Sequence, residues 1–196
     1  PVKKDYFFVS SSAPKKISFL GPTGTFTQLA ANLYFAEQGD YLPCPTIDDV
    51  FANVEQKISE YGVVPVENST EGAVNNTQDC LIDSQLAIVG EVIVPIVHDF
   101  LVNKALKNTA QIERIVSHKQ SLAQCRNWLM SNFPHTQLQD VSSNGQAAQL
   151  ASEDASTAAI AGALAGKMYG LKSLHSAIQD KSNNSTRFLV LAENEK

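Results

Sequence analysis

Positive charge is scarce in this sequence. Lysine and arginine number 15 against 20 aspartates and glutamates, which gives a formal net charge of −5. Nucleic-acid-binding domains carry an excess of lysine and arginine because these residues neutralise phosphates, so we expect no nucleic-acid partner. Charged residues of both signs make up 18% of the chain and hydrophobic residues 43%. That balance favours a folded domain over a disordered one.

Cysteine is also rare, and its spacing excludes two classes of small domain. Cys44, Cys80 and Cys125 contain no Cys-x-x-Cys pair, so they predict neither a disulfide framework nor a zinc site. The four histidines lack the i, i+4 spacing of metal ligands, and we expect no metal. An odd number of cysteines without such motifs suits a reducing cytosol, so we expect a cytoplasmic protein.

Long apolar runs and cofactor fingerprints are missing as well. The longest apolar stretch, 86–97, is interrupted by Glu91 and is too short to span a bilayer, so we expect no membrane association. The first residues lack the continuous apolar segment of a secretory signal. The glycines at 21–24 do not follow the dinucleotide-binding pattern, and 162–167 is one residue short of a phosphate-binding P-loop. We therefore expect no cofactor.

What the sequence does contain is an alternation of short hydrophobic runs and amphipathic stretches. Apolar runs bounded by turn residues predict strands, and apolar residues at helical spacing predict helices. The expected strands are 17–20, 61–66, 112–116, 137–141, 157–161 and 187–191, and the expected helices are 26–38, 74–82, 122–133, 146–153, 163–169 and one that Thr46 caps. A longer extended segment, 86–101, is expected to cross between two lobes. The alternation predicts an α/β fold with a parallel or mixed sheet flanked by helices.

Polar loops follow four of the predicted strands, at 21–27, 67–72, 117–121 and 142–145. Ligands bind at the carboxyl ends of strands in such sheets, and helix N-termini there favour an anion. A turn and a helix cap would explain the same residues without a ligand. Ser117 and His118 are adjacent and do not predict a nucleophile–base pair. Gln124 fits an ordinary helix position, and Arg187 fits a surface ion pair.

Taken together, these loops resemble those of the prephenate dehydratase family. The resembling stretches occur in the family's order and extend over nearly the whole chain: 19–27, 64–72, 117–125, 169–171, 178–180 and 184–188. One such stretch would be a weak signal, whereas the ordered set is specific. The resemblance therefore outweighs the interpretation of each loop as a plain turn or cap.

The resemblance implies a fold and a division of the chain. The family has a two-lobed α/β fold similar to type II periplasmic solute-binding proteins, with mixed sheets flanked by helices and the active site in the inter-lobe cleft. On this basis we expect an N-terminal arm over 1–15. The first lobe would comprise 16–97 and 183–196, and the second lobe 98–182. A cleft between lobes is a common place for a ligand pocket.

The resemblance also implies a reaction and its residues. The family's enzymes are carbon–oxygen lyases of phenylalanine biosynthesis, which convert the dicarboxylate prephenate to phenylpyruvate with loss of water and carbon dioxide. The catalytic threonine of the family falls on Thr186, which we expect to donate a hydrogen bond to the departing hydroxide. Arg187 is expected to bind a substrate carboxylate and Glu67 to serve as an acid. The remaining expected substrate-binding residues are Thr23, Thr25, Asn68, Ser69, Ser117 and Gln124.

Two rival functions and two questions of assembly stay open at this point. An arogenate dehydratase performs the same elimination on the aminated substrate, and a non-catalytic solute-binding or sensor module uses the same fold. Family members usually continue after the Thr-Arg-Phe strand into an ACT domain that binds phenylalanine. We expect this chain to represent the catalytic domain without that regulatory domain and to be insensitive to phenylalanine. The sequence leaves open whether it forms a homo-oligomer.

Overall fold

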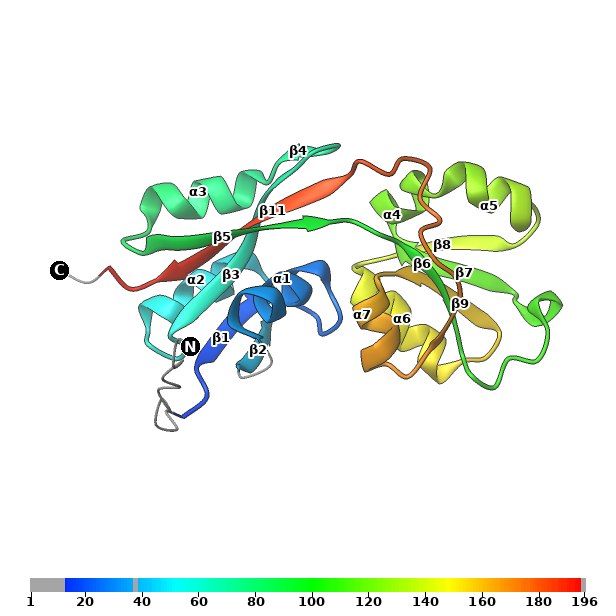
Figure 1. The fold of residues 1–196 in the computed structure, drawn as a ribbon, viewed down its shortest axis with the longest axis horizontal. Helices are drawn as coiled ribbons and strands as arrows, with labels where there is room; N and C mark the ends of the chain where they lie inside the picture. Colours follow the sequence, from blue (N-terminus) through cyan, green and yellow to red (C-terminus); the bar gives the residue numbers. More distant parts are fainter. Residues whose placement is uncertain (1–12, 37–38, 195–196) are drawn as a thin grey trace, which may run out of the picture.

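A computed structural model of the chain describes residues 13–36 and 39–194. It contains two β-sheets side by side along the long axis of the molecule, each flanked by helices (Figure 1). The predicted α/β fold with mixed sheets is thereby confirmed. The predicted arm 1–15 lies almost entirely outside the described residues. Within the described ranges, no helix is long and apolar enough to cross a membrane.

The first sheet has the strand order β2-β1-β3-β11-β5, with the short β4 paired to β3. Strand β1 runs parallel to β2 and β3, whereas β11 runs antiparallel to both β3 and β5. The strands are β1 (Lys16–Leu20), β2 (Asp40–Cys44), β3 (Tyr61–Asn68), β4 (Gly72–Ala73), β5 (Ala87–Pro95) and β11 (Ser185–Ala192), and the helices are α1 (Phe26–Phe35), α2 (Ile47–Glu55) and α3 (Asn75–Asp83).

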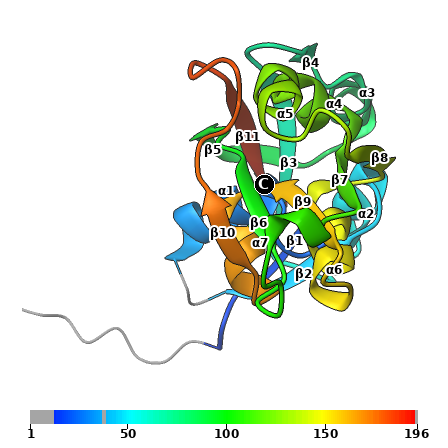
Figure 2. The same ribbon diagram turned by 90° about the vertical axis from the view of Figure 1, so that its right-hand side faces the viewer.

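The second sheet has the strand order β10-β6-β9-β7-β8. Its strands are β6 (Asp99–Val102), β7 (Arg114–His118), β8 (Gln137–Val141), β9 (Thr157–Ala161) and β10 (Lys172–His175). Its helices are α4 (Lys119–Gln124), α5 (Arg126–Asn132), α6 (Asn144–Glu153) and α7 (Ala163–Met168), and Thr109–Gln111 forms a 3-10 turn. Figure 2 shows α4 and α5 on one side of this sheet and α6 and α7 on the other.

Two connections join the sheets within the described residues. The predicted extended segment 86–101 is in fact two strands, β5 and β6, which belong to different sheets and are joined by Ile96–His98. The crossing expected in this segment is confirmed. The chain returns through 176–184, between β10 and β11. The lobe boundaries near 97 and 183 stay a prediction. They agree with the sheets, because the strands before 97 and after 183 belong to the first sheet and those between belong to the second.

Hydrophobic burial on both faces explains why β11 and β3 lie inside the first sheet. Phe188 and Val190 are buried in a cluster that includes α1, and Leu189 and Leu191 are buried in a cluster that includes α2. A strand covered on both faces is apolar at nearly every position, as the Phe-Leu-Val-Leu run of β11 is. The core therefore fixes this strand, and with it the residues at its N-terminal end.

The sequence prediction missed the strands β2, β4 and β10 and joined two helices. Strands β2 and β10 are short strands of mixed polarity at sheet edges, and β4 has only two residues, so none of them has a long apolar run to mark it. The predicted helix 122–133 is divided into α4 and α5 at Cys125. The reason is Asp180, whose carboxylate accepts the N–H groups of Asn127 and Trp128 at 3.1 and 3.4 Å and so caps a second helix.

Candidate active site

The first polar pair of the site joins neighbouring strands of the first sheet. Thr186 on β11 lies opposite Asn68 on β3. The side-chain amide of Asn68 donates to the Thr186 hydroxyl, with 2.8 Å between Nδ2 and Oγ1. Thr186 is only 8% exposed, so this hydroxyl sits where water competes little for its hydrogen bonds.

A β-bulge places these two side chains together. Arg187 pairs with Glu67, but the next residue of β11, Phe188, pairs with Pro65, so Val66 is an extra residue on β3. In a regular ladder Val66 would pair with Arg187, and Glu67 would stand opposite Thr186 instead of Asn68. The bulge therefore gives the catalytic candidate an amide neighbour in place of a carboxylate.

The loop after β3 fixes the orientation of the Asn68 amide. Its Oδ1 accepts the backbone N–H groups of Thr70 and Glu71, both at 2.9 Å, in the arrangement of an Asx turn. The amide oxygen is thereby occupied, and Nδ2 is left to donate to Thr186. Because the Thr186 oxygen accepts this bond, its own proton stays available to donate elsewhere.

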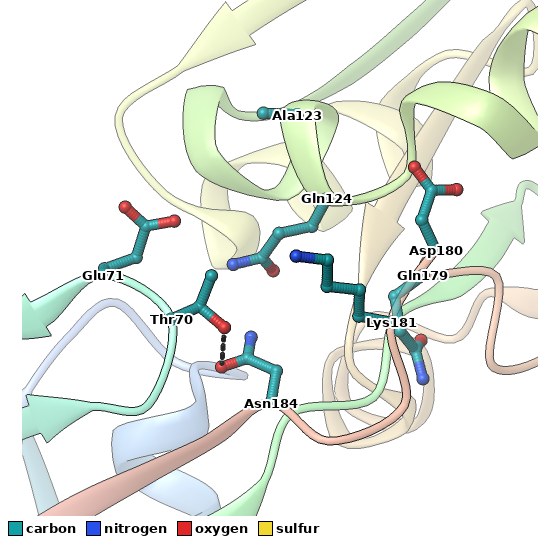
Figure 3. Close-up of a pocket in the computed structure, with 8 residues that line it drawn as sticks. All are labelled: Thr70, Glu71, Ala123, Gln124, Gln179, Asp180, Lys181 and Asn184. Atoms are coloured by element: carbon teal, nitrogen blue, oxygen red, sulfur yellow. Dashed lines mark hydrogen bonds between the residues drawn. The ribbon is translucent and has the colours of Figure 1, made fainter.

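Ser69 ties the same loop to the start of β11. Its hydroxyl accepts the backbone N–H of Ser185 at 2.9 Å and lies 3.3 Å from the side-chain oxygen of Asn184. The Thr70 hydroxyl also reaches this Asn184 oxygen, at 3.3 Å (Figure 3). Ser69 is thus a structural contact between the two segments that carry Asn68 and Thr186.

A cavity of about 220 Å³ opens beside this loop. Its size suits a small metabolite, because pockets for drug-sized ligands are larger. The lining residues come from the loop after β3, the end of α4 and the return connection: Thr70, Glu71, Ala123, Gln124, Gln179, Asp180, Lys181 and Asn184. Segments attached to both sheets therefore contribute walls. Thr186 and Asn68 are not among the lining residues, but each lies two positions from one that is, Asn184 and Thr70.

The charges around the cavity are unevenly arranged. Among the described residues that line it, Lys181 is the one cation, and its ammonium group extends towards Gln124 (Figure 3). Asp180 lies at the side, and its carboxylate faces the N-terminus of α5 as its cap. Glu71 lies 3.5 Å from the amide of Gln120. Among the lining side chains drawn in Figure 3, Lys181 and Gln124 are therefore the hydrogen-bond donors nearest the centre of the cavity.

Arg187 and Glu67 lie apart from Thr186. Successive side chains of a strand point to opposite faces, so Arg187 projects from the face of β11 opposite to Thr186. Its guanidinium lies 3.4 Å from the Glu67 carboxylate and 3.7 Å from that of Glu91. The structure thus brings Asn68 and Thr186 together and leaves Arg187 in an ion-pair network on the other face.

Three other predicted residues hold the fold together in this structure. Ser117 is fully buried, and its hydroxyl lies 2.6 Å from the carbonyl oxygen of Ile160. Thr25 caps α1, since its hydroxyl accepts the N–H of Gln28. The carbonyl oxygen of Thr23 accepts the hydroxyl of Tyr169, from the end of α7. Their predicted roles in substrate binding stay predictions.

Sequence reasoning missed two residues that the structure brings into the site. Lys181 lines the cavity. It directly follows the resembling stretch 178–180, and that position is the signal that could have identified it. The imidazole of His98 lies 2.7 Å from the Gln124 amide, between Nε2 and Oε1. Burial lowers the pKa of His98, and the bond to Gln124 only partly offsets this. His98 carried no signal beyond its place in the crossing segment.

Metal and thiol chemistry find no support among the described residues. They contain no group of three or more histidines, cysteines, aspartates or glutamates that could hold a metal ion. All three cysteines are free. Cys125 is buried, and burial raises the pKa of its thiol to about 12, so this residue is not a nucleophile near neutral pH.

Sequence comparison places this geometry in a family. The chain matches the family described as prephenate dehydratase over residues 17–196. It is 47% identical to the bifunctional chorismate mutase/prephenate dehydratase of Pseudomonas aeruginosa over 182 residues, or 93% of this chain and 50% of that protein. The chain spans about half the length of the first relatives it matches.

Two of the solved structures with a similar fold carry different descriptions. The prephenate dehydratase of Arthrobacter aurescens in complex with L-Phe has a TM-score of 0.83 and 30% identity, covering 92% of this chain and 61% of that one. A protein described as GqqA, a novel type of quorum quenching acylase, has a TM-score of 0.83 and 27% identity, covering 93% and 65%. With the family match extending over nearly all of its length, the chain belongs to the prephenate dehydratase family.

Proposed function

We propose that this chain catalyses the decarboxylating dehydration of prephenate to phenylpyruvate. The observation that carries the proposal is the Asn68–Thr186 pair, which leaves a hydroxyl proton free to donate. Asn68 and Thr186 each lie two positions from a residue that lines the cavity, Thr70 and Asn184. Membership in the family and the 47% identity to a bifunctional relative support the same reaction. We place the reaction in the cytoplasm, where the three free thiols would stay reduced.

The elimination breaks a C–C bond and a C–O bond, and it forms a C=C bond of the ring, a C=O bond of carbon dioxide and an O–H bond of water. The ring carboxylate leaves as carbon dioxide, its C–C electron pair completes the aromatic ring, and the C–O bond to the ring hydroxyl breaks. The oxygen leaves with the electron pair of the C–O bond, and a proton from solvent makes it water. Thr186 is too weak an acid to lose its proton, so it donates a hydrogen bond to the oxygen as negative charge develops there. One positioned donor of this kind contributes roughly a hundred- to a thousandfold.

Lys181 and Gln124 suit the binding of the other carboxylate. Decarboxylation removes the negative charge of the ring carboxylate, so an ammonium group held against it would stabilise the substrate more than the transition state. We therefore assign Lys181 and the Gln124 amide to the carboxylate of the pyruvyl side chain, which keeps its charge throughout. Asn68 orients Thr186 instead of binding the carboxylate.

The geometry supports elimination better than acyl hydrolysis, the activity named for GqqA. An acylase that used Thr186 as a nucleophile would need a base to take its proton. In this structure the Thr186 oxygen accepts a hydrogen bond from an amide N–H. An amide N–H cannot remove a proton, so it leaves the hydroxyl a donor. We assign no acylase activity to this chain.

The test is incubation of the purified chain with prephenate and, separately, with arogenate. We expect phenylpyruvate from prephenate, detected by chromatography against an authentic standard. Phenylalanine formed from arogenate at a higher kcat/KM would reassign the chain as an arogenate dehydratase. A chain that binds prephenate and converts neither substrate would instead act as a solute-binding module.

A further inference from the structure

His98 is a buried histidine that touches two residues of the cavity wall. It lies on the connection between β5 and β6 and is 1% exposed. Its ring contacts the side-chain oxygen of Gln124 at 2.7 Å. Its backbone N–H donates to the side-chain oxygen of Gln179 at 2.9 Å. Both glutamines line the cavity.

The hydrogen bond to Gln124 determines where the ring carries its proton. A side-chain oxygen is only an acceptor, so Nε2 of His98 must be the donor. The other ring nitrogen, Nδ1, is buried and has no hydrogen-bond partner among the described residues. A second proton there would be an unpaired donor on a buried cation, which is costly. The ring is therefore neutral and protonated at Nε2. The ring of Phe26 packs against it in a T-shaped arrangement, with 5.7 Å between the ring centroids.

The occupied oxygen of Gln124 fixes what that side chain offers to a ligand. With Oε1 held by His98, the amide NH₂ of Gln124 faces the cavity, on the side of Thr70 (Figure 3). A rotated amide would turn its oxygen towards the ligand, and that oxygen would repel a carboxylate. We propose that His98 is a positioning residue that holds Gln124 with its N–H groups towards the substrate carboxylate. This inference rests on the proposed function.

A spectroscopic experiment tests the hydrogen bond without any substrate. In protein labelled with ¹⁵N-histidine, long-range proton–nitrogen correlation spectra report which ring nitrogen carries the proton, and the spectrum of the His98→Gln variant identifies the His98 signals. We expect the Nε2-protonated form, with its Nε2 signal shifted in Gln124→Met. A ring protonated at Nδ1, or signals unchanged in Gln124→Met, would overturn the proposal.

A kinetic experiment tests the consequence for the reaction. We expect His98→Met to lower kcat/KM about tenfold, mainly through KM, because one orienting hydrogen bond is lost. His98→Gln keeps an N–H donor at a similar reach and should recover most of this loss. The double variant His98→Met with Gln124→Met should be no slower than Gln124→Met alone, since both changes act through the same amide.

The outcomes separate this inference from the proposed function. Losses that add in the double variant, or a His98→Gln variant no better than His98→Met, would show that His98 does not act through Gln124. Circular dichroism and thermal midpoints verify that each variant is folded. If the unmodified chain fails to convert prephenate, the proposed function fails, and the ring protonation still decides whether His98 holds Gln124.

Discussion

Two asparagines at the ends of strands serve opposite purposes in the two lobes. Asn68 is the last residue of β3, accepts two backbone N–H groups with its side-chain oxygen and donates from its nitrogen to Thr186. Asn144 begins α6, and its oxygen lies within hydrogen-bond distance of Ser117, the backbone N–H of His118 and Ser121. Its nitrogen also contacts Ser121, at 3.0 Å.

The difference lies in what each cluster leaves unused. Around Asn144, amide and hydroxyls satisfy one another inside the second lobe, and Ser117 is fully buried. Around Asn68, backbone groups satisfy the amide oxygen, and the hydroxyl proton of Thr186 remains available to donate. Loops of similar composition can therefore form a ligand site or only stabilise the fold. What distinguishes the two is whether any hydrogen-bond donor is left without a partner.

Removing the hydroxyl of Thr186 tests the site cluster most directly and should have the largest effect. We expect Thr186→Ala to lower kcat by roughly a hundredfold or more, because a hydrogen bond made in the transition state is lost. Thr186→Ser keeps the hydroxyl and is the matched control. Initial rates with prephenate, together with a circular dichroism spectrum, measure the effect. Near-normal kcat in a folded Thr186→Ala variant would remove Thr186 from the mechanism.

Substitutions of Asn68, the neighbour of Thr186, test whether Thr186 must act as a hydrogen-bond donor. In Asn68→Asp the carboxylate can still accept the N–H groups of Thr70 and Glu71, but it would also accept the proton of Thr186. We expect kcat to fall by about tenfold or more, since the donor is turned away from the substrate. Asn68→Ala, which loses the orientation but adds no acceptor, should be less impaired. The opposite order of the two rates would contradict the donor role of Thr186.

Ser117→Ala tests the hydrogen-bonded cluster around Asn144 in the second lobe. Loss of this buried hydroxyl leaves partners unsatisfied, and we expect the free energy of unfolding to fall by about 1–3 kcal/mol. The kinetic constants should stay within about twofold of those of the unmodified chain. Urea unfolding followed by fluorescence gives the first quantity. A large rise in KM with unchanged stability would instead support the substrate-binding role predicted from the sequence.

Arg187→Met should have the smallest effect on the chemistry. Its side chain lies on the face opposite Thr186 and pairs with Glu67 and Glu91, so we expect KM to change by no more than about threefold. Arg187→Lys, which keeps the charge, is the control for the ion pairs. If KM rose more than tenfold in Arg187→Met and only partly recovered in Arg187→Lys, a bidentate contact with a substrate carboxylate would be indicated.

The sequence was informative where hydrophobic pattern and burial coincide. The strands 137–141 and 157–161 occur at the predicted bounds, and the crossing in 86–101 was visible because its apolar run is longer than one strand. Which polar residues meet could not be predicted in the same way. The contact between Asn68 and Thr186 depends on one extra residue, Val66, in the register. The burial of Ser117 depends on Ile160 of a strand distant in sequence.

The two connections between the sheets limit how this fold can be recombined. His98 lies on the first, and Gln179, Lys181 and Asn184 lie on the second. A protein engineer would exchange one lobe for that of a relative at these segments, yet the second is a wall of the cavity and the first holds Gln124 of that wall through His98. A functional chimera must keep both connections from a single parent and place its crossover points inside the lobes. The connections then pass on part of the cavity wall together with the link between the lobes.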